Sequence, residues 1–136
     1  MNDTGDRPWM GEAVIAGAAY TVIGAAFALP ATHLKFWRLA AWIVSGIVFV
    51  MHVGVEHVRL RSARVVAWHA AVGAAIGGFG LAAAAILRRL SEGQPTPRLQ
   101  GLGFAVWPLV TGIPAFVVAL VIATLLARLP QEERKR

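Results

Sequence analysis

The sequence contains no cysteine, and only 15% of its 136 residues are charged. The absence of cysteine excludes disulfides, thiolate metal ligands and cysteine nucleophiles. The chain also has no Ser-His-Asp ordering, no H-E-x-x-H motif and no glycine-rich phosphate-binding loop. Its longest polar connection is about ten residues, which is too short to fold as a domain outside a membrane. We therefore expect a non-enzymatic protein without catalytic residues, whose function lies within its apolar segments or at their rims.

Apolar residues make up 57% of the chain, which is too high a share for an ordinary soluble domain of this size. They form four runs, each long enough to cross the hydrocarbon core of a bilayer as a helix. The expected transmembrane helices are residues 12–29, 36–58, 65–87 and 102–129. The sequence thus predicts an all-α fold, a transmembrane four-helix bundle that forms a single membrane domain over 1–136, with polar tails at 1–11 and 130–136.

The end of the first apolar run, Ala26-Phe27-Ala28, has the small-x-small form of a signal-peptide cleavage site. A signal peptide begins with a basic segment, whereas the residues that precede this run carry more acid than base. We therefore expect the first run to be retained as a transmembrane helix.

The net charge of +6 is concentrated in the connections between the apolar runs. No helix has a basic face of the kind that binds DNA, so the charge indicates membrane topology and no nucleic-acid partner. The side of the predicted bundle that holds both termini carries eight Lys and Arg residues: Arg7, Arg59, Arg61, Arg64, Arg128, Arg134, Lys135 and Arg136. The other side carries five: Lys35, Arg38, Arg88, Arg89 and Arg98. Because Lys and Arg are enriched on the cytoplasmic side, this difference predicts that both termini are cytoplasmic.

Two of the predicted helices carry stripes of glycine. Gly73, Gly77 and Gly80 have the spacing i, i+4, i+7, and Gly17 and Gly24 lie two turns apart on the first helix. Small residues let helix backbones approach closely in a bilayer. These stripes therefore predict packing faces, which could meet a neighbouring helix, a partner protein or a flat pigment.

Polar residues that could carry chemistry gather around the second predicted hairpin. His52, Glu56 and Arg59 are spaced i, i+4, i+7 and share one helix face, whereas His57 points away from His52. His69 lies on the next helix at a depth similar to that of His52, given the helical rise per residue. Because ionisable side chains are costly in a membrane, this cluster is the candidate functional site.

One interpretation of the cluster is structural. Glu56 would form an ion pair with Arg59 or Arg64, and His52 and His69 would be hydrogen-bonded across the hairpin. Such contacts would fix the register of the two helices, with the long side chains reaching water at the interface. This interpretation requires no cofactor.

Two further interpretations assign a ligand to the same residues. His52 or His57, together with His69, could be the axial ligands of a haem, or one of them could ligate a chlorophyll-type pigment. Alternatively, His52, Glu56 and His69 could form a metal site with two histidines and one carboxylate, or a proton-handling group. A tight hairpin argues against a haem, because its two axial ligands must be well separated.

The hairpin also resembles part of a group of small bacterial membrane proteins of unknown function. The resemblance extends into the glycine- and alanine-rich stretch that ends at Leu81, and it rests on the motif His52-x3-Glu56-His57-x-Arg59-Leu60-Arg61-x2-Arg64-x4-His69. It implies a four-helix bacterial membrane protein, and we expect this protein to lie in the inner membrane. It implies no activity, cofactor, partner or functional residue.

Together these features predict a small accessory or scaffold subunit of a membrane complex. Its expected partners are the lipid bilayer and other membrane subunits or further copies of itself, contacted through the glycine and alanine faces. A single chain of this size cannot enclose a transport pathway, so the alternative of a transporter or channel would require an oligomer.

Overall fold

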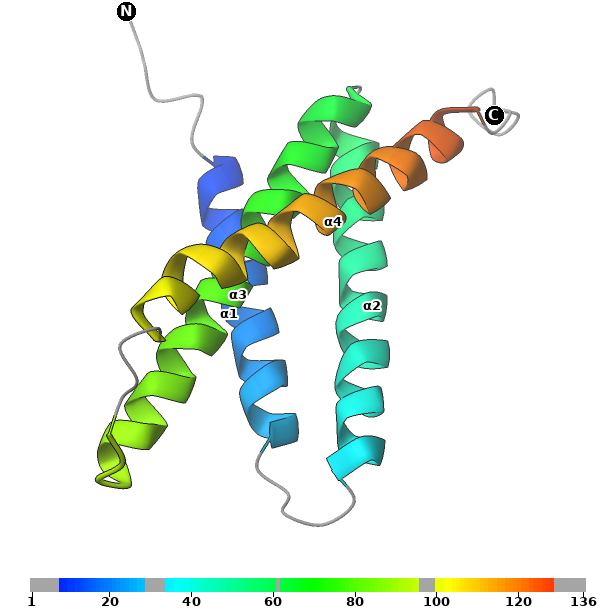
Figure 1. Cartoon of the computed structure of the whole chain (residues 1–136). Coiled ribbons are helices and arrows are strands. Elements are labelled where there is room, and N and C mark those ends of the chain that lie inside the picture. The colour runs from blue at the N-terminus through cyan, green and yellow to red at the C-terminus, as the bar shows by residue number, and fades with distance from the viewer. Residues whose placement is uncertain (1–7, 29–33, 61, 96–99, 129–136) are drawn as a thin grey trace, which may run out of the picture.

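The computed structural model describes residues 8–28, 34–60, 62–95 and 100–128 of the chain. These residues form four long helices and, within these ranges, no strand (Figure 1). The helices are α1 (Pro8–Ala28), α2 (Leu34–Arg59), α3 (Ala63–Ser91) and α4 (Gln100–Arg128). The predicted all-α four-helix fold is confirmed.

Each helix overlaps its predicted span and extends past it at one end or both. The largest differences are of four residues, at the start of α1 and at the end of α3. Part of the expected N-terminal tail is therefore helical. Pro8 suits this position, because the first residues of a helix have no partner for their N–H groups and proline lacks that group. The predicted final residues Leu29 and Leu129, and the rest of the two tails, lie outside the described residues.

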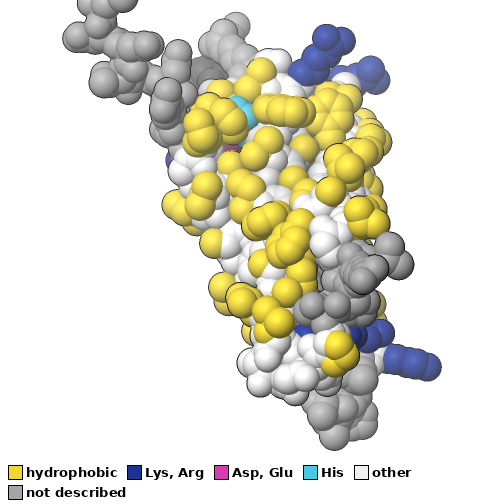
Figure 2. Space-filling model, turned by 60° about the vertical axis from the view of Figure 1, so that its left-hand side comes forward, with side chains coloured by type: hydrophobic (Ala, Val, Ile, Leu, Met, Phe, Trp, Pro, Cys, Tyr) yellow, Lys and Arg dark blue, Asp and Glu magenta, His cyan; other side chains and the backbone are white. Residues whose placement is uncertain are grey.

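All four helices are long and apolar enough to cross a membrane. Figure 2 shows hydrophobic side chains along the whole of one face, with lysine and arginine confined to its ends. This distribution is typical of a multi-pass membrane protein, in which lipid covers the apolar surface and water reaches the charged ends.

Helix α3 is the central element and packs on α1 through glycine. A Cβ atom added at Gly77 would lie 2.7 Å from the Cβ atom of Tyr20, so only glycine fits there. The hydroxyl of Thr21 donates to the Gly17 carbonyl oxygen at 2.9 Å and lies 3.4 Å from that of Gly77. All the glycines predicted to pack helices lie at this contact: Gly17, Gly24, Gly73, Gly77 and Gly80.

The opposite side of α3 packs on α4, again at small residues. A Cβ atom at Gly112 would lie 3.3 Å from the Cβ atom of Ala75. Thr111 accompanies this contact, because its hydroxyl donates to the Ala74 carbonyl oxygen across the interface at 3.1 Å. Helix α3 is thus held between two helices that approach its backbone closely.

Helix α2 stands beside the other three and approaches α3 and α4 near its C-terminal end (Figure 1). There Val53 is fully buried in an apolar cluster with Val66, Ala67, Ala70, Ala119 and Ala123. At its other end α2 meets α1 through the rings of Trp37 and Phe27, whose centroids are 5.8 Å apart. Between Lys35 and His52 no residue of α2 is buried.

Candidate functional site

The candidate site lies where the N-terminal ends of α1 and α3 meet the C-terminal end of α2. Because consecutive helices run in opposite directions, these three ends lie on the same side of the bundle. Each helix contributes an ionisable side chain within its first or last three turns. The site, called the Glu–His cluster below, consists of Glu12, His52, Glu56, Arg59 and His69.

The centre of the cluster is a buried pair between α2 and α3. His69 Nδ1 and Glu56 Oε2 are 2.8 Å apart and hydrogen-bonded. Glu56 is 3% exposed and His69 8% exposed, so neither reaches bulk solvent freely. Trp9 of α1 stacks on the imidazole of His69, with ring centroids 4.7 Å apart and planes inclined by 7°. The contact of Trp9 fixes the ring, and the hydrogen bond fixes the nitrogen that faces Glu56.

The second pair lies nearer the rim and joins α1 to α2. The guanidinium of Arg59 donates to Glu12 Oε1, and both side chains are partly exposed. Glu56 and Arg59 lie one turn apart on α2, so this helix is tied to α3 through one pair and to α1 through the other.

This pairing corrects the structural interpretation of the sequence. Glu56 binds His69, while Arg59 binds Glu12 in place of Glu56. Arg64 is exposed and takes part in none of the ion pairs formed among the described residues. The predicted hydrogen bond between His52 and His69 is likewise replaced, because the Glu56 carboxylate occupies His69 Nδ1. A carboxylate is the stronger acceptor for an imidazole N–H, which explains the preference.

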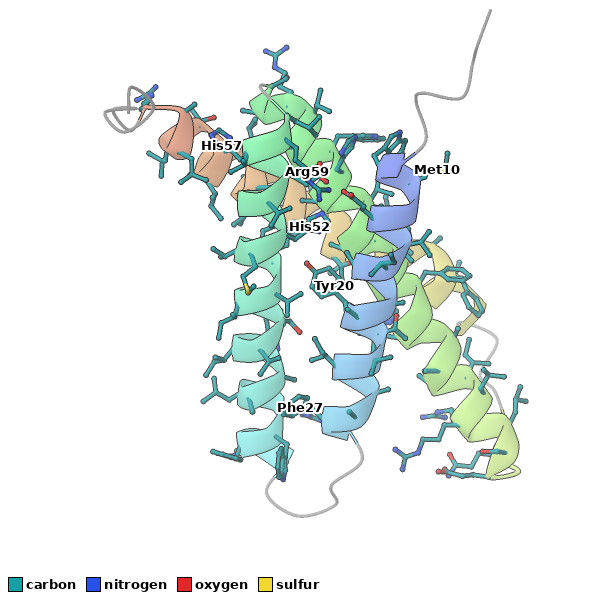
Figure 3. All side chains as sticks on the ribbon, turned by 180° about the vertical axis from the view of Figure 1, so that it is seen from behind. Met10, Tyr20, Phe27, His52, His57 and Arg59 are labelled. Carbon is teal, nitrogen blue, oxygen red and sulfur yellow. The ribbon has the colours of Figure 1, made fainter. Side chains whose placement is uncertain are left out.

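The remaining histidines of the hairpin have buried nitrogen atoms without a partner. His52 Nε2 and His57 Nδ1 form no hydrogen bond in the described part of the chain, and neither does the buried hydroxyl of Tyr20. Figure 3 shows His52 on the side of α2 that faces α1 and Tyr20, whereas His57 projects from the other side. His52 is therefore the member of the cluster at its edge, and His57 lies outside the cluster.

The structure does not arrange the predicted metal ligands around one point. Among the residues that the structure describes, no three His, Cys, Asp or Glu side chains are placed to hold a metal ion. His52, Glu56 and His69 consequently form no ligand set, because the hydrogen bond of Glu56 to His69 engages the carboxylate and one imidazole nitrogen with each other.

Sequence reasoning missed Glu12 and Trp9. Glu12 is 47 residues from Arg59 along the chain, so no spacing rule joins them. One signal was nevertheless present, since Glu12 is the only Asp, Glu, Lys or Arg in the first predicted helix. A single carboxylate in a membrane helix needs a partner on another helix, and Arg59 was an available one.

No protein-family model, curated protein or solved structure matches this chain. The function must therefore be argued from the cluster and from the surfaces of the helices alone.

Proposed function

We propose that the chain is a small, non-enzymatic accessory or scaffold subunit of a complex in the bacterial inner membrane, with both termini in the cytoplasm. The observation that carries this proposal is the open face of α2. A helix that its own chain leaves uncovered, and that contains glycine in the middle of the uncovered face, is suited to receive a further helix.

The open face of α2 consists of Leu39, Trp42, Ile43, Gly46 and Val50. These residues are spaced i, i+3, i+4, i+7 and i+11, which places them on one side of the helix. All five are exposed, and Trp42 has the largest exposed fraction of any large hydrophobic residue, at 80%. The opposite side of the same helical segment is half-buried against the bundle.

Gly46 distinguishes the open face from an apolar surface that only contacts lipid. A Cβ atom at Gly46 would meet no atom within 4 Å, whereas the glycines between α1 and α3 are enclosed by side chains. Gly46 therefore packs against no other helix in the described part of the chain. It contributes no side chain between Trp42 and Val50, and this gap, called the hollow below, can receive a side chain of a partner helix.

The proposed orientation rests on the distribution of Lys and Arg. The short connection between α2 and α3 is strongly basic, and short basic loops are the most reliable cytoplasmic markers. The start of α1 and the end of α4 lie on the same side of the four helices as this connection, so we expect both termini to share its compartment.

The mass of the protein in a mild detergent or in lipid nanodiscs tests the proposal. We expect native mass spectrometry to show an assembly larger than one chain. Substitution Gly46→Leu should reduce it to the single chain by filling the hollow, whereas Gly101→Leu, at a glycine that is equally unobstructed on α4, should leave the mass unchanged. A wild-type protein that is strictly monomeric and without a bound partner would contradict the proposal.

A second candidate function is the binding of a haem or a chlorophyll-type pigment. The observation that favours it is the pair of buried imidazole nitrogens on His52 and His57 that have no hydrogen-bond partner. Neutral imidazole nitrogen is the usual axial ligand of such rings. A visible absorption spectrum of the purified protein decides the matter, because a bound ring gives a Soret or chlorophyll band and a colourless preparation rejects this candidate.

A further inference from the structure

We infer that a groove between α3 and α4 binds one acyl chain of an anionic phospholipid, whose phosphate pairs with Arg64. The inference does not depend on the proposed accessory role, because the groove lies on helices other than α2. It rests on the shape and lining of the groove, on its depth in the bilayer and on the charge at its end.

The groove has a volume of about 360 Å³ and is lined almost entirely by apolar side chains. Its base contains Ala71 and Gly112, which are buried where the two helices approach closely. Large side chains form its sides: Trp68 and Val72 of α3, and Leu109, Ile113 and Phe116 of α4. Three of these side chains, Trp68, Leu109 and Ile113, are more than half exposed. The groove is therefore open to the surrounding lipid.

The groove covers one leaflet of the bilayer. On α3 it runs from Trp68 to Ala75, and the helix begins at Ala63. From the rise per residue, these positions lie about 8 and 18 Å from the start of the helix, while half of the hydrocarbon core is about 15 Å thick. The groove therefore extends from the headgroup region to the middle of the bilayer. This is the depth of a single acyl chain, whereas a partner helix would cross both leaflets.

An arginine lies at the headgroup end of the groove. Arg64 precedes Trp68 by one helical turn, which places it on the same face of α3 as the groove. It is exposed and takes part in none of the ion pairs formed among the described residues. Neither α3 nor α4 contains an aspartate or glutamate, so these helices offer Arg64 no carboxylate. The occupant that complements the groove therefore joins an apolar chain to an anion.

An anionic phospholipid has both parts at the required positions. A guanidinium binds phosphate oxygens through two parallel hydrogen bonds. The ring of Trp68 lies one turn below Arg64, at the level where amphipathic indoles meet the polar part of the lipid, and its N–H group can donate to an ester carbonyl oxygen. A zwitterionic headgroup would add a cation, for which α3 and α4 provide no acidic partner.

Native mass spectrometry of the full-length protein in detergent tests the role of the headgroup. Delipidated protein is titrated with phosphatidylglycerol, which is anionic, and with phosphatidylcholine, which is zwitterionic and carries the same acyl chains. We expect phosphatidylglycerol to bind about fivefold more tightly, since one arginine near the membrane surface favours an anionic lipid to this extent.

Substitution Arg64→Gln should remove this preference for phosphatidylglycerol. Arg128→Gln is the matched control, because Arg128 is also exposed and lies on the same side of the bundle. It is about 18 Å along α4 from Phe116, the nearest residue of the groove on that helix, so the preference should remain. Equal affinity for the two lipids in the wild type, or equal losses from the two substitutions, would overturn the inference.

Photochemical labelling in lipid bilayers locates the acyl chain. Phosphatidylglycerol with a diazirine in one acyl chain is added in small amount to phosphatidylcholine bilayers that contain the protein, and peptide mass spectrometry identifies the labelled residues. We expect several-fold more label at Leu109 and Ile113 in the groove than at Val117 and Val118 outside it, although all four are 48–62% exposed. In Arg64→Gln the two pairs of residues should be labelled equally.

The labelling of the wild-type protein decides between occupants without any variant. Equal labelling of the two pairs would mean that lipid surrounds the groove only as a solvent. Labelling of Val117 and Val118 that leaves Leu109 and Ile113 unlabelled would mean that a partner helix covers the groove. Either result would overturn the inference, and excess label in the groove would support it.

Discussion

Helices α3 and α2 are both long enough to cross a bilayer, yet they are held in the molecule by different kinds of contact. One third of the most apolar 18-residue stretch of α3 is buried, because glycine and alanine let α1 and α4 approach its backbone on both sides. The corresponding share in α2 is 11%, and the two residues of α2 that are described as buried, Val53 and Glu56, lie in its last two turns.

The difference in burial between α2 and α3 arises because the helices are surrounded by lipid. Leucine and valine gain little by leaving lipid for protein, so large apolar side chains alone do not fix a helix in a bundle. Close backbone contact holds α3, whereas polar contacts and one small apolar cluster hold the end of α2. The remainder of α2 also has many large apolar residues, yet the described part of the chain leaves one of its faces exposed.

The sharpest test of this comparison introduces the same side chain into both regions. Gly77→Leu would drive a large group into Tyr20 and separate α1 from α3, so we expect a loss of about 3 kcal/mol or more. Gly46→Leu places the group in open space and should change the stability of the single chain by less than about 0.5 kcal/mol. Equilibrium unfolding in mixed detergent micelles measures both, and equal losses would refute the distinction.

The hydrogen bond between Glu56 and His69, which holds the end of α2, can be removed without changing the apolar faces of this helix. Glu56→Leu leaves His69 buried without its carboxylate, and we expect a cost of about 1–3 kcal/mol from the unpaired imidazole. The rate of disulfide formation between cysteines introduced at Val53 and Ala67 should fall as α2 separates, with Glu92→Leu as the control. An unchanged rate of disulfide formation would mean that the apolar cluster alone holds this end of α2 against α3.

A smaller effect is expected from the aromatic contact that covers the cluster. Trp9→Ala removes the ring stacked on His69, and we expect a loss of about 0.5–1.5 kcal/mol. Trp42→Ala removes the same ring from the open face of α2 and should have less effect on the unfolding of the single chain. A greater loss of stability from Trp42→Ala would mean that Trp42 packs more closely than Trp9, which would contradict the comparison.

The fold was predictable because length and apolarity suffice to identify membrane helices. The glycine spacing also indicated which faces of the first and third helices pack, as Gly17 and Gly77 show. It did not indicate which helix would cover the other side of α3. The contact of Gly78 with α4, and that of Gly112 of α4 with Ala75, depend on the path of a helix that begins beyond a loop. Spacing within one helix carries no information about that path.

The location of the site could be predicted from the sequence, but the partners of its hydrogen bonds and ion pairs could not. The sequence placed Glu56 and His69 on one hairpin but matched the depth of His69 to that of His52, and the structure joins His69 to Glu56. The partner of Arg59 was beyond sequence reasoning, because it depends on how α1 sits against α2. The pairing of each carboxylate with a basic side chain depends on the distances between helices. The helical periodicity of one segment carries no information about these distances.

The described part of the chain leaves one face of α2 exposed, and we propose that another helix packs there. Because the sequence has no cysteine, single cysteines can be placed along α2 and labelled with nitroxides, whose collision rate with oxygen reports exposure to lipid. In the isolated chain, positions 39, 42, 43, 46 and 50 should be highly accessible to oxygen, and in the assembled protein the same positions should become protected. Protection of this face in the isolated chain, or unchanged access in the assembly, would contradict the account.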